Sequence, residues 1–77
     1  MKSVKNLLRD LDFYHCYGTW IHRDYKNIKI KLVVSKNTFF INFYDGIRSF
    51  ESLRFKKIGF DLELIEEQIL ERIIEFV

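Results

Sequence analysis

Residues 28–44 read IKIKLVVSKNTFFINFY and predict a β-hairpin. Apolar residues recur at every second position of the first half, which is the period of a strand with one buried face. Lys36-Asn37 suits a two-residue loop, because asparagine tolerates the left-handed conformation that such loops require. The loop predicts three apolar pairs on one face: Val34 with Phe39, Leu32 with Ile41 and Ile30 with Phe43. A slip by one residue would mix lysine with isoleucine on that face, so the pattern favours this register.

The residues before this hairpin predict a further strand in the same sheet. A turn over residues 24–27 pairs Ile21 with Ile30 on the apolar face. That register places Trp20 beside Lys31 and His22 beside Lys29 on the opposite face. If helices cover only the apolar face, the opposite face is an exposed aromatic and basic surface, which is typical of an interaction site. The predicted partner-binding residues are Trp20, His22, Lys29, Lys31, Phe40, Asn42, Tyr44 and the adjoining Arg48.

Two helices are expected to flank the sheet. Ser3 is the expected N-cap of the first helix, which ends near Asp12 or Phe13, and residues 14–19 are expected to form a loop that turns at Gly18. The apolar stripe of this helix follows the spacing i, i+3, i+4, i+7: Val4, Leu7, Leu8 and Leu11. Asp61 is the expected N-cap of the second helix.

The chain between the hairpin and the last helix leaves two points open. Asp45-Gly46 predicts another hairpin leading into residues 47–51, with either a two-residue turn or a three-residue loop that has Gly46 in a bulge. Residues 52–58 fit a strand end or a helical turn. The expected fold is therefore α+β, with a three- to four-stranded antiparallel sheet between an N-terminal and a C-terminal helix, in the order α-β-β-β-(β)-α.

The last helix offers two candidate surfaces. Glutamates recur every four residues and form an acidic ridge: Glu63, Glu67, Glu71 and Glu75. The apolar arc spans about half the helix circumference, which is wider than one contact needs. Either both flanks of the arc pack on the sheet, or the helix pairs with a partner or joins two copies of the chain through Leu70, Ile74 and Val77.

Length, charge and composition narrow the class of protein. The 77 residues suit one domain over 1–77, and no apolar run approaches the roughly 18 residues that span a bilayer. A single cysteine makes no internal disulfide, so a cytoplasmic setting is expected. Residues 1–60 carry 12 Lys/Arg against 5 Asp/Glu, whereas residues 61–77 carry Arg72 against six acids, so a net +2 hides a basic body and an acidic tail. The absence of Ala and Pro, with abundant Ile, Phe and Lys, indicates AT-rich coding DNA.

No catalytic or cofactor site is expected. His15, Cys16 and His22 are too few and wrongly spaced for zinc. The three glycines lie too far apart for a phosphate-binding loop. We therefore expect a non-enzymatic binding protein without metal or cofactor.

Two hypotheses for the binding function follow. The element order is similar to that of double-stranded RNA-binding domains, but Gly59-Phe-Asp-Leu-Glu63 stands where that family has basic residues, so membership is rejected. In size, element order and AT-rich coding the chain resembles very small phage inhibitors, anti-CRISPR proteins among them. This resemblance implies a phage or mobile-element protein that occludes a host nucleic-acid-processing (defence) enzyme, with Trp20, Phe40 and Tyr44 as anchors. The alternative is RNA or single-stranded DNA binding on the same face. A third expectation opposes both: residues 50–58 or the last helix cover this face, and Trp20 and Phe40 form a second small core.

Overall fold

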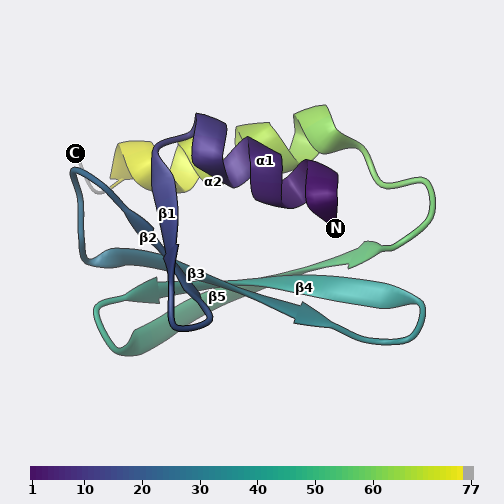
Figure 1. Cartoon of the computed structure of the whole chain (residues 1–77), viewed down its shortest axis with the longest axis horizontal. Helices are drawn as coiled ribbons and strands as arrows, with labels where there is room; N and C mark the ends of the chain where they lie inside the picture. The colour runs from purple at the N-terminus through teal and green to yellow at the C-terminus, as the bar shows by residue number, and fades with distance from the viewer. Residues whose placement is uncertain (76–77) are drawn as a thin grey trace.

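The computed structural model describes residues 1–75 and has an α+β fold (Figure 1). Its elements are α1 (Lys2–Asp10), β1 (Phe13–Cys16), β2 (Thr19–His22), β3 (Ile28–Val34), β4 (Thr38–Asp45), β5 (Arg48–Lys56) and α2 (Leu62–Glu75). The expected fold class is confirmed, with five strands where three to four were expected. The radius of gyration of 11.6 Å is close to the value of about 11.5 Å for a compact domain of this length.

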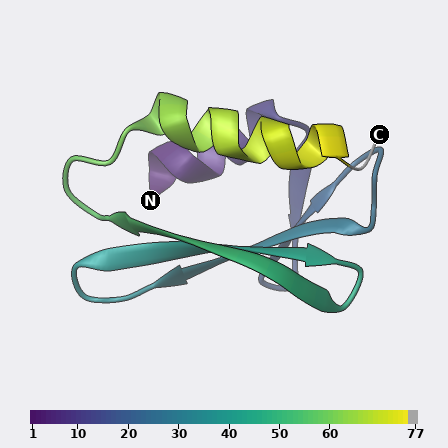
Figure 2. The ribbon, with the colours of Figure 1, turned by 180° about the vertical axis from the view of Figure 1, so that it is seen from behind.

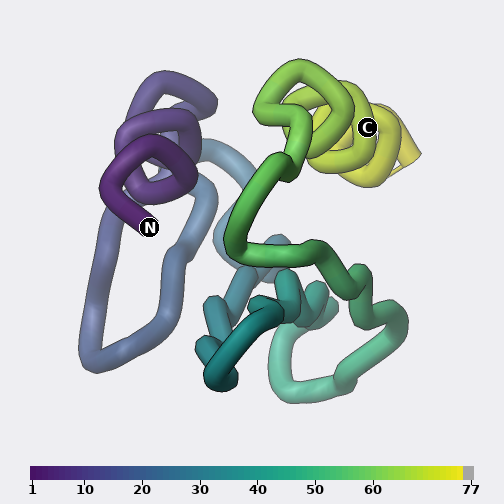
Figure 3. The backbone as a smooth tube through the Cα atoms, turned by 90° about the vertical axis from the view of Figure 1, so that its right-hand side faces the viewer, coloured from purple at the N-terminus to yellow at the C-terminus, as the bar shows by residue number. Residues whose placement is uncertain are grey.

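The five strands form one antiparallel meander in the order β1-β2-β3-β4-β5. Both helices lie on one face of this sheet, with α2 in front of α1 when the molecule is seen from behind (Figure 2). Viewed from the side, the helices lie next to each other in one layer and the central strands lie below them (Figure 3). The core fills the space between the two layers, where Leu8, Phe39 and Ile69 are fully buried.

The β3–β4 hairpin confirms the register expected from residues 28–44. Val34 pairs with Phe39, and the other two apolar pairs follow at Leu32–Ile41 and Ile30–Phe43. The Ser35 amide donates to the Thr38 carbonyl at 2.9 Å and closes the loop. The register is well determined because any slip would move the isoleucines of β3 out of the core.

The register expected for β2 was wrong by one residue. Trp20 pairs with Ile30, and Ile21 pairs with Lys29. Trp20 and His22 therefore lie on the core face, where they are 3% and 5% exposed, and Ile21 lies on the opposite face. Burying the large indole gains more than burying Ile21 would, because apolar stabilisation grows with the area removed from water.

His22 is held on the core side by the turn that follows it. Its Nδ1 accepts hydrogen bonds from the amides of Asp24 at 3.1 Å and Tyr25 at 3.2 Å. The imidazole also lies edge-on to the Phe13 ring, with centroids 5.1 Å apart. His22 therefore acts as a structural residue of the β2–β3 turn.

Residues 14–19, expected as a loop, belong to a tight hairpin. β1 pairs with β2 from Phe13–His22 to Cys16–Thr19. Tyr17 and Gly18, with φ of 48° and 78°, make the turn, so the expected turn at Gly18 is confirmed. Glycine adopts this backbone region without strain, so Gly18 favours the reversal of the chain here.

α1 begins two residues earlier than expected, since Met1 rather than Ser3 is its N-cap, and it ends at Asp10 rather than near Asp12 or Phe13. The expected apolar stripe is confirmed. Val4, Leu7 and Leu8 are buried, and Leu11 packs half-buried against the same core.

The two open points after the hairpin are now resolved. Asp45 pairs with Arg48, so Gly46-Ile47 is a two-residue turn, and a bulge interrupts the ladder one step further in, at Phe43/Tyr44. Residues 52–56 continue β5 as a strand.

The expected cap of α2 is confirmed. One carboxylate oxygen of Asp61 accepts from the amides of Glu63 at 3.0 Å and Leu64 at 3.4 Å. Ile65 and Ile69 are fully buried against the sheet.

An ion pair also ties α2 to β5. The buried Arg72 guanidinium donates to the Glu51 carboxylate and, at 2.7 Å, to the Gln68 carbonyl oxygen. It also lies 5.1 Å from the centre of the Phe43 ring. Nothing in the sequence distinguished Arg72 from an ordinary surface cation, so this contact was not predicted.

Candidate functional site

The sheet has one face that no other element covers within residues 1–75 (Figure 3). We call it the outer face and define it by the strand residues that alternate with the core. The expectation that residues 50–58 or α2 fold over it was wrong, because both lie elsewhere. Its residues are Tyr14, Cys16, Thr19, Ile21, Lys29, Lys31, Val33, Thr38, Phe40, Asn42, Tyr44, Ser49, Ser52, Arg54 and Lys56.

The outer face is basic. Two lysines project from β3, Lys29 and Lys31, and two cations project from β5, Arg54 and Lys56. No Asp or Glu occupies an outer-face position in the part of the chain that the structure describes. Charge of one sign on an open surface attracts anionic partners and raises their rate of association.

Aromatic and amide groups separate these cations. The Lys31 ammonium lies 5.3 Å from the centre of the half-buried Tyr44 ring. Asn42 accepts a hydrogen bond from the Ser52 hydroxyl at 2.5 Å. Phe40 is half-buried, with Val33 and Arg54 opposite it on the two neighbouring strands. The centre of the face therefore offers rings and hydrogen-bonding groups between positive charges.

A groove of about 300 Å³ lies at the end of the outer face near the β4–β5 turn. Lys29, Lys31 and Tyr44 form its floor. Tyr17 and Ile47 from two different turns also line the groove, and their side chains are almost fully exposed. The prediction brought the three floor residues together correctly but missed the two turn residues, whose position beside the groove depends on the β1–β2 hairpin.

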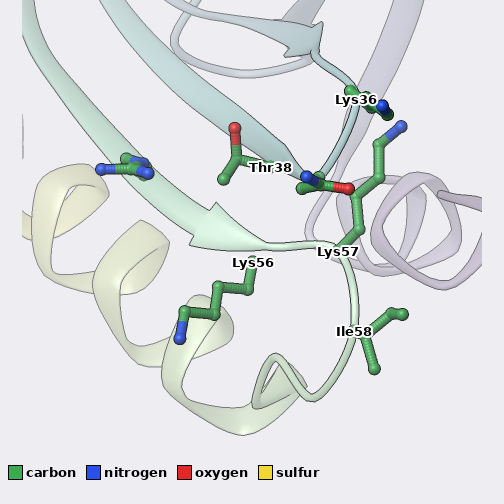
Figure 4. Close-up of a pocket in the computed structure, with 7 residues that line it drawn as sticks. Lys36, Thr38, Lys56, Lys57 and Ile58 are labelled. Atoms are coloured by element: carbon green, nitrogen blue, oxygen red, sulfur yellow. The ribbon is translucent and has the colours of Figure 1, made fainter.

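A second hollow of about 440 Å³, the hairpin pocket, lies at the opposite end of the sheet, beside the β3–β4 loop (Figure 4). It is lined by Lys36, Asn37, Thr38, Arg54, Lys56, Lys57 and Ile58. The prediction included none of these residues. The adjacent lysines Lys56 and Lys57 indicated a local concentration of positive charge. Their pairing with the β3–β4 loop, however, depends on β5 continuing past Ser52.

Three of the eight predicted partner-binding residues do not lie on the outer face. Trp20 and His22 are buried in the core. Arg48 is exposed but lies opposite Asp45 at the β4–β5 turn, and it does not adjoin the lysines. The five that do share the outer face are Lys29, Lys31, Phe40, Asn42 and Tyr44.

The acidic ridge of α2 is present as expected. All four of its glutamates are exposed, and the ridge lies on the helix layer, across the molecule from the outer face. On the arc proposed for dimerisation, Leu70 is 38% and Ile74 71% exposed, while Val77 lies outside the described residues. One flank of the arc therefore does not pack on the sheet.

Residues 1–75 contain no cluster of three or more metal-ligating side chains. They also contain no helix long and apolar enough to cross a membrane. Comparisons with protein families, with curated proteins and with solved structures found no match.

Proposed function

We propose that this protein is a non-catalytic module that binds single-stranded RNA or DNA along its outer face. The observation that carries the proposal is the alternation on this face of four cations with Phe40, Asn42 and Tyr44, while no described Asp or Glu occupies an outer-face position. Single-strand binders combine a basic surface that follows the phosphates with aromatic rings on which bases stack.

The spacing of the cations and aromatic rings on the outer face suits a flexible single strand of nucleic acid. Lys29 and Lys31 lie two residues apart on β3, so about 7 Å separates their backbones. Arg54 and Lys56 have the same spacing on β5, and β4 with its aromatic residues runs between them. A single strand of RNA or DNA that crosses the sheet thus meets cations on either side for its phosphates, and aromatic rings in the middle for its bases.

The acidic ridge of α2 also favours binding of the nucleic acid on the outer face rather than on α2. Its four exposed glutamates repel phosphates from α2. α2 is acidic while the outer face is basic, so a small net charge of +2 is compatible with a directional field between them. Approach of a polyanion is thereby directed to the outer face.

The inhibitor hypothesis loses its largest anchor in this structure. Protein interfaces depend on a few buried aromatic or arginine side chains, and Trp20 was the chief candidate. Trp20 is 3% exposed and packs within the core, leaving Phe40 and Tyr44. Occlusion of a host enzyme, and with it a phage origin, stays a prediction from the sequence, and nucleic-acid binding is the function that the exposed residues favour.

The test is a fluorescence anisotropy titration of labelled single-stranded RNA and DNA at about 50 and about 200 mM salt. Lys31→Glu should weaken binding about tenfold at the lower salt and reduce the salt slope, because it removes one phosphate contact and adds repulsion. Lys5→Glu, at an exposed position of α1, is the matched control, with the same change in charge on the helix layer. Equal effects of the two variants, or no binding of any strand by the wild type, would overturn the proposal.

A further inference from the structure

The hairpin pocket is built by backbone pairing, so its shape does not depend on long side chains alone. Thr38 at the start of β4 pairs with Lys56, and the Lys57 amide donates to the Asn37 carbonyl at 2.9 Å. These contacts hold the β3–β4 loop against the last residues of β5. Lys36 and Lys57 extend along the same side of the pocket, and Lys56 extends toward the other side (Figure 4).

The pocket concentrates positive charge without an internal counter-charge. Its lining contains Lys36, Arg54, Lys56 and Lys57 and no acidic residue. None of these four cations forms an ion pair with another part of residues 1–75, where the Arg72–Glu51 pair involves a different region. Like charges that share a concave site repel each other, so a bound anion relieves this repulsion.

The walls of the pocket can contact the organic part of a phosphorylated ligand as well as its phosphate. Ile58, 91% exposed at its edge, and the aliphatic stems of the lysines give it apolar sides, while Thr38 and Asn37 provide hydroxyl and amide groups. A volume of about 440 Å³ falls within the range of sites that hold small organic ligands, about 300–1,000 Å³. A phosphate carried on a sugar and base uses both the cations and the apolar walls.

We infer that the hairpin pocket binds a phosphorylated end of the nucleic-acid strand that lies on the outer face, which rests on the function proposed above. Arg54 and Lys56 belong both to the outer face and to the pocket lining, so the two surfaces are continuous. A terminal phosphate monoester carries about −1.5 to −2 charges at neutral pH, against −1 for an internal phosphodiester. The cluster of cations at this end therefore selects the end of a strand.

The experiment compares one short single-stranded oligonucleotide in three forms: with a 5′-phosphate, with a 3′-phosphate and with neither. One phosphorylated form should bind about five- to tenfold more tightly than the unphosphorylated one. Lys36→Ala/Lys57→Ala should abolish this preference, while its affinity for the unphosphorylated strand changes less than about threefold. The matched variant Lys29→Ala/Lys31→Ala should weaken all three forms and keep the preference, because it changes only the other end of the face.

A second measurement separates failure of this inference from failure of the proposed function. A nucleoside monophosphate is titrated into the protein, and the amide signals of Asn37, Thr38 and Lys57 are followed by NMR. Shifts at these amides support the pocket even if no strand binds, whereas tight strand binding with no preference for a phosphorylated end overturns the pocket alone. Shifts of equal size with inorganic phosphate would overturn the assignment of a nucleotide.

Discussion

The two faces of the sheet consist of the same strands and have opposite roles. On β3, Ile28 and Ile30 are buried against the helices, while Lys29 and Lys31, which alternate with them, point to the uncovered side. On β2, Trp20 and His22 lie inside and Ile21 lies outside. Neighbouring positions of one strand therefore separate core packing from the proposed binding surface, which gives each variant on one face a natural control on the other.

The largest expected effect is at Trp20, on the core face. Trp20→Ala should lower the free energy of unfolding by about 3–5 kcal/mol, because it leaves a cavity between β2 and α1. Tyr17→Ala, in the neighbouring turn and fully exposed, should change it by less than about 0.5 kcal/mol. Urea denaturation of both variants checks this, and a mild effect at Trp20 would contradict its burial.

The ion pair between β5 and α2 should give a smaller, asymmetric effect. Glu51→Ala leaves the guanidinium of Arg72 buried without its carboxylate and should cost about 1–3 kcal/mol. Arg72→Met removes the buried charge and keeps most of the apolar stem, so it should cost less. Thermal or urea unfolding of the two variants compares them directly, and the reverse order would show that the pair does not secure α2.

A change at His22 tests the turn rather than the core volume. His22→Phe keeps a ring beside Phe13 but removes the acceptor for the amides of Asp24 and Tyr25. The expected loss is about 1–2 kcal/mol, with faster hydrogen exchange at those two amides. Unchanged exchange would mean that the imidazole does not order the turn.

Lys31→Ala should have the smallest effect on stability and a clear effect on binding. Its free energy of unfolding should stay within about 0.5 kcal/mol of the wild type, because the side chain is exposed. Its affinity for a single strand should fall, with a salt slope shallower by about one. Ile30→Ala, at the adjacent buried position, should cost about 2–5 kcal/mol, and similar stability losses at both positions would contradict the separation of the two faces.

Two hairpins show what the sequence could and could not predict. The β3–β4 hairpin was predicted to the residue, because seven residues of β3 and eight of β4 alternate strongly and a two-residue loop fixes their pairing. The β1–β2 hairpin has four residues on each strand, and Thr-Trp-Ile-His offers an apolar residue to either face. Its register depends on packing of Trp20 beneath the Arg9 guanidinium, at 5.2 Å from the ring centre, which is a tertiary contact.

The candidate site was likewise predictable where it depends on the β3–β4 hairpin and not where it depends on distant contacts. Lys29, Lys31, Phe40, Asn42 and Tyr44 follow from the β3–β4 register alone, and they lie together as expected. The hairpin pocket requires Lys57 to pair with the loop at Asn37, twenty residues earlier in the chain. Local patterns do not encode such a distant pairing when the connecting segment is itself ambiguous between strand and helix.

The central claim is that the outer face binds single-stranded nucleic acid, and NMR mapping tests it most directly. A short single-stranded RNA or DNA is titrated into the labelled protein while every backbone amide is followed. The account predicts saturable shifts at Lys31, Asn42, Tyr44 and Arg54, and almost none along α2. Shifts confined to the acidic ridge of α2, or no shifts with any strand, would contradict it.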